Sequence, residues 1–413
     1  MISAEVLFVI ILTVIIFDYL LEQFLDFLNA RYWSDKLPDE LTGIYDAEKY
    51  KKSQEYAKAK RKISTLLSTF STVLIIGLFY WKGFVILDDY LRNITQNQIL
   101  LGLLFFGIIG FLADILSMPF DLYNTFVIEE KFGFNKTSVR TYIIDKLKGW
   151  LLAAFLGGGL LALIIWIYTE TTSYFWIFAW GVIGIFMIFM SMFYSVLIVP
   201  LFNKQVPLAE GELRTAIENF AVKAGFALDN IYVIDGSKRS SKANAYFSGF
   251  GPKKRIVLFD TLIQNHTVEE LVAVLAHEIG HYKKKHTYLG LGISLVQTGF
   301  MFFILSLFIG NPLLSEALGS TNTSFHIGVI VFAILYSPVS LVLGLLTNHL
   351  SRKHEFEADR FAGEKYDADS LGNALKKLSV NNLSNLKPHP IYTFFYYSHP
   401  PLLERLAALN KIN

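Results

Sequence analysis

The chain has 413 residues, of which 53% are hydrophobic and only 17% are charged. Soluble domains carry roughly 25% charged residues, so this composition excludes a disordered chain and argues against a purely soluble protein. The net charge of +2 gives no indication of nucleic-acid binding. Because cysteine is absent, a metal would need nitrogen and oxygen ligands, for which nine histidines are available.

Seven apolar stretches recur along the chain, and each approaches or exceeds the ~20 residues that a helix needs to cross a bilayer. None of them alternates with a period of two, so we predict helices rather than barrel strands. Three of the stretches contain charged residues, among them Asp18, Lys82 and Asp114. The stretches cover residues 3–28, 63–87, 98–118, 150–168, 175–200, 288–309 and 326–346.

The basic residues are distributed asymmetrically between the connecting segments. With seven spans, all but two of the 37 basic residues, Lys82 and Arg92, fall on one side of the membrane. Lysine and arginine accumulate on the cytoplasmic side. We therefore predict a multi-pass integral membrane protein with its N-terminus outside or lumenal and its C-terminus in the cytoplasm. The membrane would be a bacterial inner membrane or the endoplasmic reticulum, depending on the source.

The longest polar segment, 201–286, indicates a small cytoplasmic α+β unit. We predict a helix near 208–225, strands at 230–235 and 255–260, and a helix from about 267. A Gly- and Ser-containing excursion, 238–254, connects the two strands. The predicted regions are five spans in 1–200, the cytoplasmic α+β segment in 201–286, spans six and seven in 287–346, and a C-terminal cytoplasmic segment in 347–413.

Residues 277–281 read His-Glu-Ile-Gly-His, an H-E-x-x-H pattern that chance would supply in about one of a hundred such chains. Thr267 and Glu270 form a capping-box pattern, which places the motif on a helix. His277 and His281 then lie one turn apart on the same face, as zinc requires. Glu278 is rotated by roughly 100°, so we predict that it is the general base that deprotonates a zinc-bound water.

A catalytic zinc also needs a third protein ligand. Beyond the last apolar stretch, Glu355 and Asp359 share one helical face. One can ligate the metal while the other accepts a hydrogen bond from a ligand histidine. From the residues alone, Glu355, Glu357 and His354 remain competing ligands. Both ligand helices leave the membrane near each other, so the site should lie at the cytoplasmic interface.

Together these features resemble the type I CAAX prenyl endopeptidases, which are integral-membrane zinc metalloproteases. The resemblance covers nearly the whole chain, and the FGFNK and HPP elements within it are more specific than the H-E-x-x-H motif. The matching stretches are residues 129–136, 244–249, 277–281, 351–359 and 398–401, with Arg405 downstream.

The resemblance implies a role for each remaining candidate residue. Glu355 would be the third ligand of one zinc ion per chain, with Asp359 behind it. His399 would stabilise the oxyanion. Arg405 would support the same site or bind a substrate carboxylate. Asn244, on an edge strand, would bind the substrate backbone by β-augmentation.

The implied fold is an all-α membrane protein whose seven transmembrane helices enclose a chamber, with a small cytoplasmic α+β zincin-like domain. In this fold Asp18 and Asp114 would face the chamber, since charges at membrane depth usually face a cavity, or they would pair between helices.

The implied function is zinc-dependent cleavage near the C-terminus of a peptide or protein, isoprenylated or not, beside membrane lipid and without nucleic acid. A membrane quality-control zinc protease is one alternative, although such proteases normally have fewer spans and lack the FGFNK stretch. A zinc transporter or sensor is another, but transport calls for metal ligands inside the spans. The sequence does not indicate the oligomeric state.

Overall fold

The computed structural model describes residues 2–34, 36–226, 231–249 and 255–412. Within these ranges, seven helices or continuous helical runs are long and apolar enough to cross a membrane, and each contains one of the predicted stretches or most of it. They are Ala4–Ala30 (α1), Ala47–Tyr80 (α2), Gln98–Glu129 (α4 and η2), Val139–Thr171 (α5, η3 and α6), Phe175–Phe202 (α7 and α8), His286–Phe308 (α12) and Phe325–Asn381 (α14, η7 and α15).

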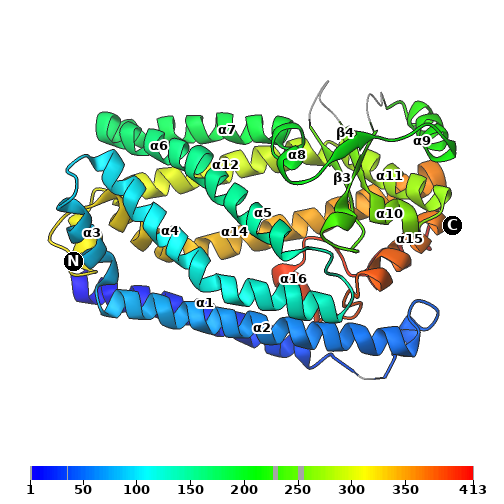
Figure 1. Ribbon diagram of the computed structural model, residues 1–413, viewed down its shortest axis with the longest axis horizontal. Helices are drawn as coiled ribbons and strands as arrows, with labels where there is room; N and C mark the ends of the chain where they lie inside the picture. Colours follow the sequence, from blue (N-terminus) through cyan, green and yellow to red (C-terminus); the bar gives the residue numbers. More distant parts are fainter. Residues whose placement is uncertain (1, 35, 227–230, 250–254, 413) are drawn as a thin grey trace.

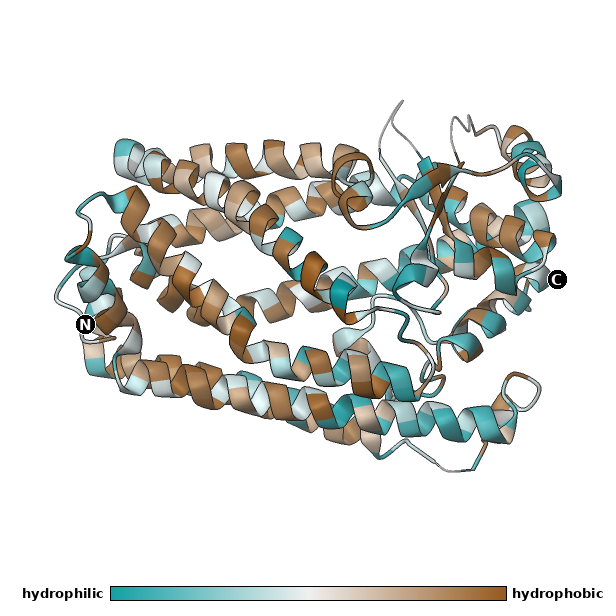
Figure 2. Cartoon of the chain, viewed as in Figure 1, coloured by the Kyte–Doolittle hydropathy of each residue, from teal (hydrophilic) through white to brown (hydrophobic). Residues whose placement is uncertain are grey.

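The long helices run side by side along the length of the molecule, and the sheet and its helices lie at one end (Figure 1). The long helices are mainly hydrophobic, and hydrophilic residues are more frequent at the end with the sheet (Figure 2). The shorter helices are α3 (Gly83–Arg92), α9 (Glu212–Lys223), α10 (Asp260–Asn265), α11 (Val268–Lys283), α13 (Pro312–Glu316), α16 (Pro390–Tyr396) and α17 (Leu402–Leu409). The longer runs divide into α4 (Gln98–Tyr123), α5 (Val139–Leu152), α6 (Gly158–Thr171), α7 (Phe175–Leu197), α8 (Val199–Phe202), α14 (Phe325–Ala362) and α15 (Ala368–Asn381). Single 3₁₀ or π turns are η1 (Asp39–Leu41), η2 (Asn124–Glu129), η3 (Ala153–Gly157), η4 (Thr172–Tyr174), η5 (Gly236–Lys238) and η7 (Gly363–Asp367).

The second predicted stretch, 63–87, extends too far. Helix α2 ends at Tyr80, and Lys82 adopts a left-handed backbone conformation with φ of 56°. Such a residue cannot continue a right-handed helix, so α3 begins as a separate helix at Gly83. Lys82 therefore lies beyond the end of the span and not within it.

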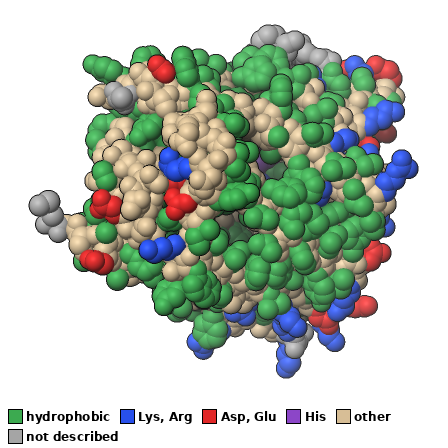
Figure 3. Space-filling view, turned by 60° about the vertical axis from the view of Figure 1, so that its left-hand side comes forward, with side chains coloured by type: hydrophobic (Ala, Val, Ile, Leu, Met, Phe, Trp, Pro, Cys, Tyr) green, Lys and Arg blue, Asp and Glu red, His purple; other side chains and the backbone are tan. Residues whose placement is uncertain are grey.

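The membrane helices enclose a cavity of about 1360 Å³. Its lining comes from α1, α2, α4, α6, α12, α14 and α16. The chamber that the resemblance implied is therefore present as a partly open cavity. One face of the molecule, covered by hydrophobic side chains, is hollowed near its centre (Figure 3).

The two acidic residues at membrane depth have different surroundings. Asp18 lines the cavity and accepts a hydrogen bond from Ser337 Oγ at 2.5 Å. Asp114 instead pairs with Lys146 Nζ at 2.7 Å and accepts a bond from Trp150 Nε1 at 2.9 Å. Each of the two predicted alternatives, facing a cavity and pairing between helices, thus applies to one of these residues.

The end of the molecule rich in hydrophilic residues contains a four-stranded sheet with the order β1-β2-β4-β3. The parallel central pair is β2 (Ile231–Ile234) and β4 (Arg255–Phe259), and both outer strands run antiparallel to their neighbours. These central strands agree with the predicted 230–235 and 255–260, although residue 230 lies outside the described residues. Helix α9 agrees with the predicted helix at 208–225.

Of the two outer strands, the first was not predicted, and the second was implied only by the resemblance, which placed Asn244 on an edge strand. They are β1 (Gln205–Pro207) and β3 (Ala245–Ser248), and the latter lies within the predicted excursion 238–254, of which residues 250–254 lie outside the described part. Strand β3 is bonded only to β4, so it forms one edge of the sheet.

Helix α11 lies in the core of the unit formed by the sheet and its helices. Its first turn has the predicted capping box, in which the side chain of Thr267 accepts from the Glu270 N–H and Glu270 bonds back. At Gly280 the helix comes very close to α14, because a Cβ there would meet the Ala358 backbone at 3.1 Å. A residue with any side chain would force the two helices apart. Gly280 therefore allows the close approach that brings Glu355 to the histidines of α11.

Candidate metal centre

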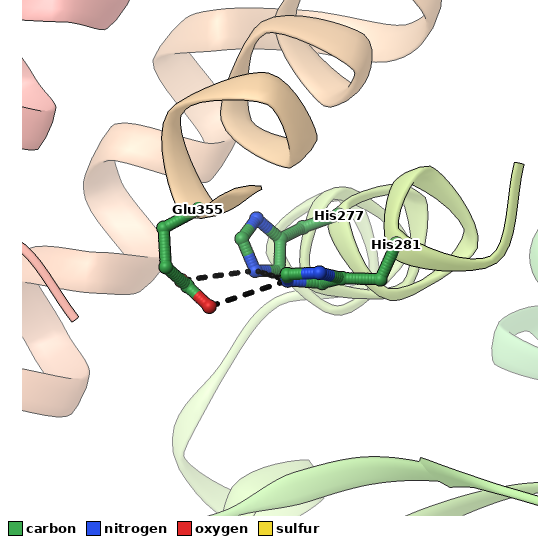
Figure 4. A group of neighbouring side chains, drawn as sticks. All are labelled: His277, His281 and Glu355. Carbon is green, nitrogen blue, oxygen red and sulfur yellow. Dashed lines mark hydrogen bonds and ion pairs between the residues drawn. The ribbon is translucent and has the colours of Figure 1, made fainter. Parts of the chain in front are cut away.

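Three side chains from two helices converge at one point. His277 and His281 extend from the same face of α11, and Glu355 reaches them from α14 (Figure 4). The Nε2 atoms of the two histidines are 3.1 Å apart. The Glu355 carboxylate lies 3.5 Å from His277 Nε2 and 3.3 Å from His281 Nε2.

These separations fit a single tetrahedral metal ion. Two ligand atoms about 2.0–2.1 Å from a zinc ion and at tetrahedral angles are about 3.4 Å from each other. The two imidazole nitrogens and one carboxylate oxygen are a donor set that zinc takes in hydrolases. Within the described residues, the Oε2 atom of Glu355 is buried without a hydrogen-bond partner. A cation between the three groups would satisfy that oxygen.

His277 is held from behind by a buried ion pair. Its Nδ1 lies 2.9 Å from Asp359 Oδ1, a geometry in which Nδ1–H donates and Nε2 is left for a metal. Arg405 of α17 grips the same carboxylate through Nε at 2.8 Å and Nη2 at 2.6 Å. Burial alone would lower the pKa of His277, but Asp359 and Glu355 outweigh it and raise the pKa to about 9 in the metal-free protein.

His281 is held by a different group, which the sequence did not reveal. Its Nδ1 lies 3.0 Å from Nδ1 of the buried His286. The Nε2 atom of His286 in turn lies 3.1 Å from Glu357 Oε2, and its ring stacks on His354 with centroids 3.9 Å apart. The chain of contacts from His281 through His286 to Glu357 fixes the orientation of the second ligand ring.

These contacts distinguish the three residues that compete as the third ligand. Glu357 and His354 both contact His286 and are not members of the His277, His281 and Glu355 group. Of the candidates, Glu355 alone brings a carboxylate oxygen to the two Nε2 atoms in the described structure. Glu355, which the resemblance favoured, is thus the candidate that lies beside His277 and His281.

The remaining candidates border a cavity of about 370 Å³ in front of the ligands. Glu278, His399, Arg405 and Asn244 all line it, together with residues of β3. The ring of His399 is exposed, and its Nε2 lies 3.2 Å from Glu355 Oε1. Arg405 is buried, and its Nη1 lies 3.5 Å from Glu355 Oε2.

Asn244 lies immediately before the edge strand. Its backbone carbonyl accepts a hydrogen bond from the Phe259 N–H of β4, and its side chain caps the N–H of Ala245. The partly buried strand β3 therefore starts beside His277, His281 and Glu355 and continues along the wall of the cavity.

The FGFNK stretch positions the segment that leads into β3. The Lys136 N–H donates to the Arg239 carbonyl at 3.0 Å, and the Ser241 N–H donates to the Phe134 carbonyl at 3.0 Å. Lys242 then donates to Glu129 Oε2 at 2.9 Å and lies over the ring of Phe134. The membrane region thereby holds the chain only two residues ahead of Asn244.

Two protein-family models match this chain, and together they cover nearly all of it. The model for the N-terminal region of CAAX prenyl proteases, with five membrane helices, matches residues 28–204, and the model for peptidase family M48 matches residues 207–413. A CAAX prenyl protease 1 homolog of Oryza sativa subsp. japonica is 38% identical, covering 97% of this chain and 96% of the relative.

More distant relatives and a solved structure agree. The CAAX prenyl protease 1 of Saccharomyces cerevisiae is 34% identical over 92% of this chain and 89% of its own. The Homo sapiens homolog is 33% identical, and the match covers 95% of this chain and 93% of the homolog. The crystal structure of S. mikatae Ste24p superposes with a TM-score of 0.93 at 33% identity, covering 98% of this chain and 99% of that one.

Proposed function

This chain belongs to the CAAX prenyl protease family of M48 metallopeptidases, and from that premise we propose that it uses one zinc ion to cleave isoprenylated peptides near their C-terminus. It is a multi-pass membrane metalloendopeptidase. The observation that carries the proposal is the convergence of His277, His281 and Glu355, at separations suited to a single metal.

In this proposal His277, His281 and Glu355 hold the zinc ion. When bound, zinc polarises the scissile carbonyl and makes a water molecule acidic enough to attack near neutral pH. Asp359 and His286 keep the two ligand rings in the tautomer and orientation that leave Nε2 free. The buried Arg405 keeps Asp359 in place, which favours a supporting role for it over direct binding of a substrate carboxylate.

Glu278 moves the protons of the reaction. It follows the first ligand on α11 and borders the cavity in front of the metal ligands. Its carboxylate would take a proton from the attacking water and later give it to the amine that leaves. General acid–base catalysis of this kind contributes about 10²–10⁴-fold to the rate.

His399 and Asn244 would act on the substrate itself. The ring of His399 is exposed at the cavity, so its N–H could be presented to the oxyanion that develops on the scissile carbonyl. The free edge of β3 borders the same cavity. A substrate strand could add to this edge by main-chain hydrogen bonds, with Asn244 at the end nearest the ligands.

The proposed organisation keeps the four regions, 1–200, 201–286, 287–346 and 347–413. The break between the two family models, after residue 204, supports the first boundary. The distribution of basic residues supports a cytoplasmic protease domain and C-terminus, with the N-terminus outside or lumenal. The substrate would then approach from the cytoplasm, with its lipid at the bilayer.

A cleavage assay with matched peptides tests the substrate class. A farnesylated CAAX peptide and the same peptide without farnesyl are incubated with the purified protein, with and without a chelator, and with Glu278→Gln as the blank. We expect cleavage of the farnesylated peptide that stops on chelation. Faster cleavage of the unfarnesylated peptide, or of unfolded membrane proteins, would contradict the substrate assignment.

A further inference from the structure

A second polar cavity lies away from the metal centre, where the membrane helices meet the sheet. Its volume is about 580 Å³, and it lies between α5, α8 with the residues that follow it, and strands β1, β2 and β4. Four of its lining side chains are cationic, and one is acidic. The cations are Lys148, Lys204, Lys238 and Arg255, and the acid is Asp235.

The cations lack acidic partners. Lys148 Nζ donates to the Leu201 carbonyl at 2.6 Å, and the Arg255 guanidinium lies 4.6 Å from the centre of the Tyr232 ring. The Nε atom of Arg255 is buried without a hydrogen-bond partner among the described residues. Lys204 and Lys238 are exposed, and no described carboxylate lies within ion-pair distance of either side chain.

The acidic residue of the cavity does not neutralise them. Asp235 Oδ1 accepts hydrogen bonds from Asn203 Nδ2 at 3.0 Å and from the Lys204 backbone N–H at 2.8 Å. Arg239, which lies nearby but does not line the cavity, differs from these cations. It is paired with Asp145 through two hydrogen bonds of 2.8 and 2.9 Å. The cavity thus retains an excess of positive charge.

We propose that this cavity binds the phosphate of an anionic phospholipid headgroup. Basic pockets between transmembrane helices on the positively charged side recognise such headgroups. The cavity lies at the end of the candidate span Phe175–Phe202, and Leu201 in its lining is an exposed apolar residue suited to an acyl chain. Tyr232 and Phe202 add aromatic surface to the lining. None of these residues belongs to the metal centre.

The experiment measures how acidic lipid stabilises the full-length protein in detergent. Phosphatidylglycerol and phosphatidylcholine are titrated separately, and the thermal unfolding midpoint is followed for the wild type, for Lys204→Gln/Lys238→Gln and for Lys51→Gln/Lys52→Gln. The second double variant removes the same charge from exposed lysines of α2 at the same end of the molecule (Figure 1). Exposed lysines leave the fold intact when replaced.

We expect phosphatidylglycerol to raise the midpoint and phosphatidylcholine to leave it nearly unchanged. The apparent affinity for phosphatidylglycerol should fall about tenfold in Lys204→Gln/Lys238→Gln and stay near the wild-type value in Lys51→Gln/Lys52→Gln. Equal losses in the two double variants would overturn the proposal, because they would indicate diffuse surface charge. An equal shift with inorganic phosphate alone would overturn the assignment to lipid.

Discussion

The two sides of the metal centre are built differently, although each holds one ligand histidine. Behind His277 lie Asp359 and Arg405, which are only 1% and 8% exposed. Behind His281 lies His286, whose carboxylate partner Glu357 has a side chain 36% exposed. A buried ion pair is expensive to break because the remaining charge cannot reach water. The residues behind His277 should therefore affect both protein stability and metal binding. The residues behind His281 should affect mainly metal binding.

Removing the ligand that the two sides share should have the largest effect. In Glu355→Gln the carboxylate that faces both Nε2 atoms loses its charge, so we expect metal binding to become substoichiometric and cleavage to be lost. Metal analysis of the dialysed protein measures this. Glu357→Gln is the matched control on the same helix and should keep its metal. Full metal content in Glu355→Gln would contradict its place in the site.

Breaking the buried ion pair behind His277 should have the next largest effect. In Asp359→Leu the guanidinium of Arg405 loses the carboxylate that it grips through two bonds. Such a loss costs about 3–5 kcal/mol, which thermal unfolding of the metal-free variant in detergent would detect. The double variant Asp359→Leu/Arg405→Leu should recover part of that loss. An unchanged midpoint in Asp359→Leu would show that the pair is not structurally important.

Replacing His286, the residue behind His281, should weaken metal binding more than it lowers protein stability. His286→Ala removes the group that orients the His281 ring, so we expect about 10–100-fold weaker metal binding. The unfolding midpoint of the metal-free protein should fall less than in Asp359→Leu. Competition with a chelator of known affinity measures the first quantity. Unchanged affinity would mean that His286 only fills space.

The smallest effect is expected at Glu357, the outermost residue in the series of contacts from His281 through His286. Glu357 is partly hydrated, and exposed ionic contacts contribute only about 0–1 kcal/mol. Glu357→Gln keeps an oxygen that can accept from His286, so metal affinity should fall less than tenfold. A loss as large as that of His286→Ala would show that the charge of Glu357, rather than the ring of His286, orients the ligand.

The parts of this structure that depend on local sequence were predictable. The apolar stretches located all seven candidate spans, and the capping box of Thr267 and Glu270 located the start of α11. The end of α2 was not predictable, since a left-handed Lys82 carries no distinctive signal in the sequence. The short strands β1 and β3 have three and four residues, too few for a periodic pattern.

In the site, too, the residues that depend on how distant segments pack could not be predicted from local sequence. Choosing Glu355 over its neighbours needs the relative rotation of α11 and α14, which the contact of Gly280 with Ala358 sets. His286 was missed because five residues along a continuous helix would point it away from His281. The helix ends at Lys283, and the left-handed Lys285, with φ of 60°, turns the chain so that the two rings meet.

The central claim is that Glu278 moves protons at a metal held by other residues. The most direct measurement determines metal content and peptide cleavage on the same preparation of Glu278→Gln. We expect one metal ion per chain and cleavage reduced by about 10²–10⁴-fold, because only the proton acceptor is removed. Cleavage at the wild-type rate, or loss of the metal together with activity, would contradict it.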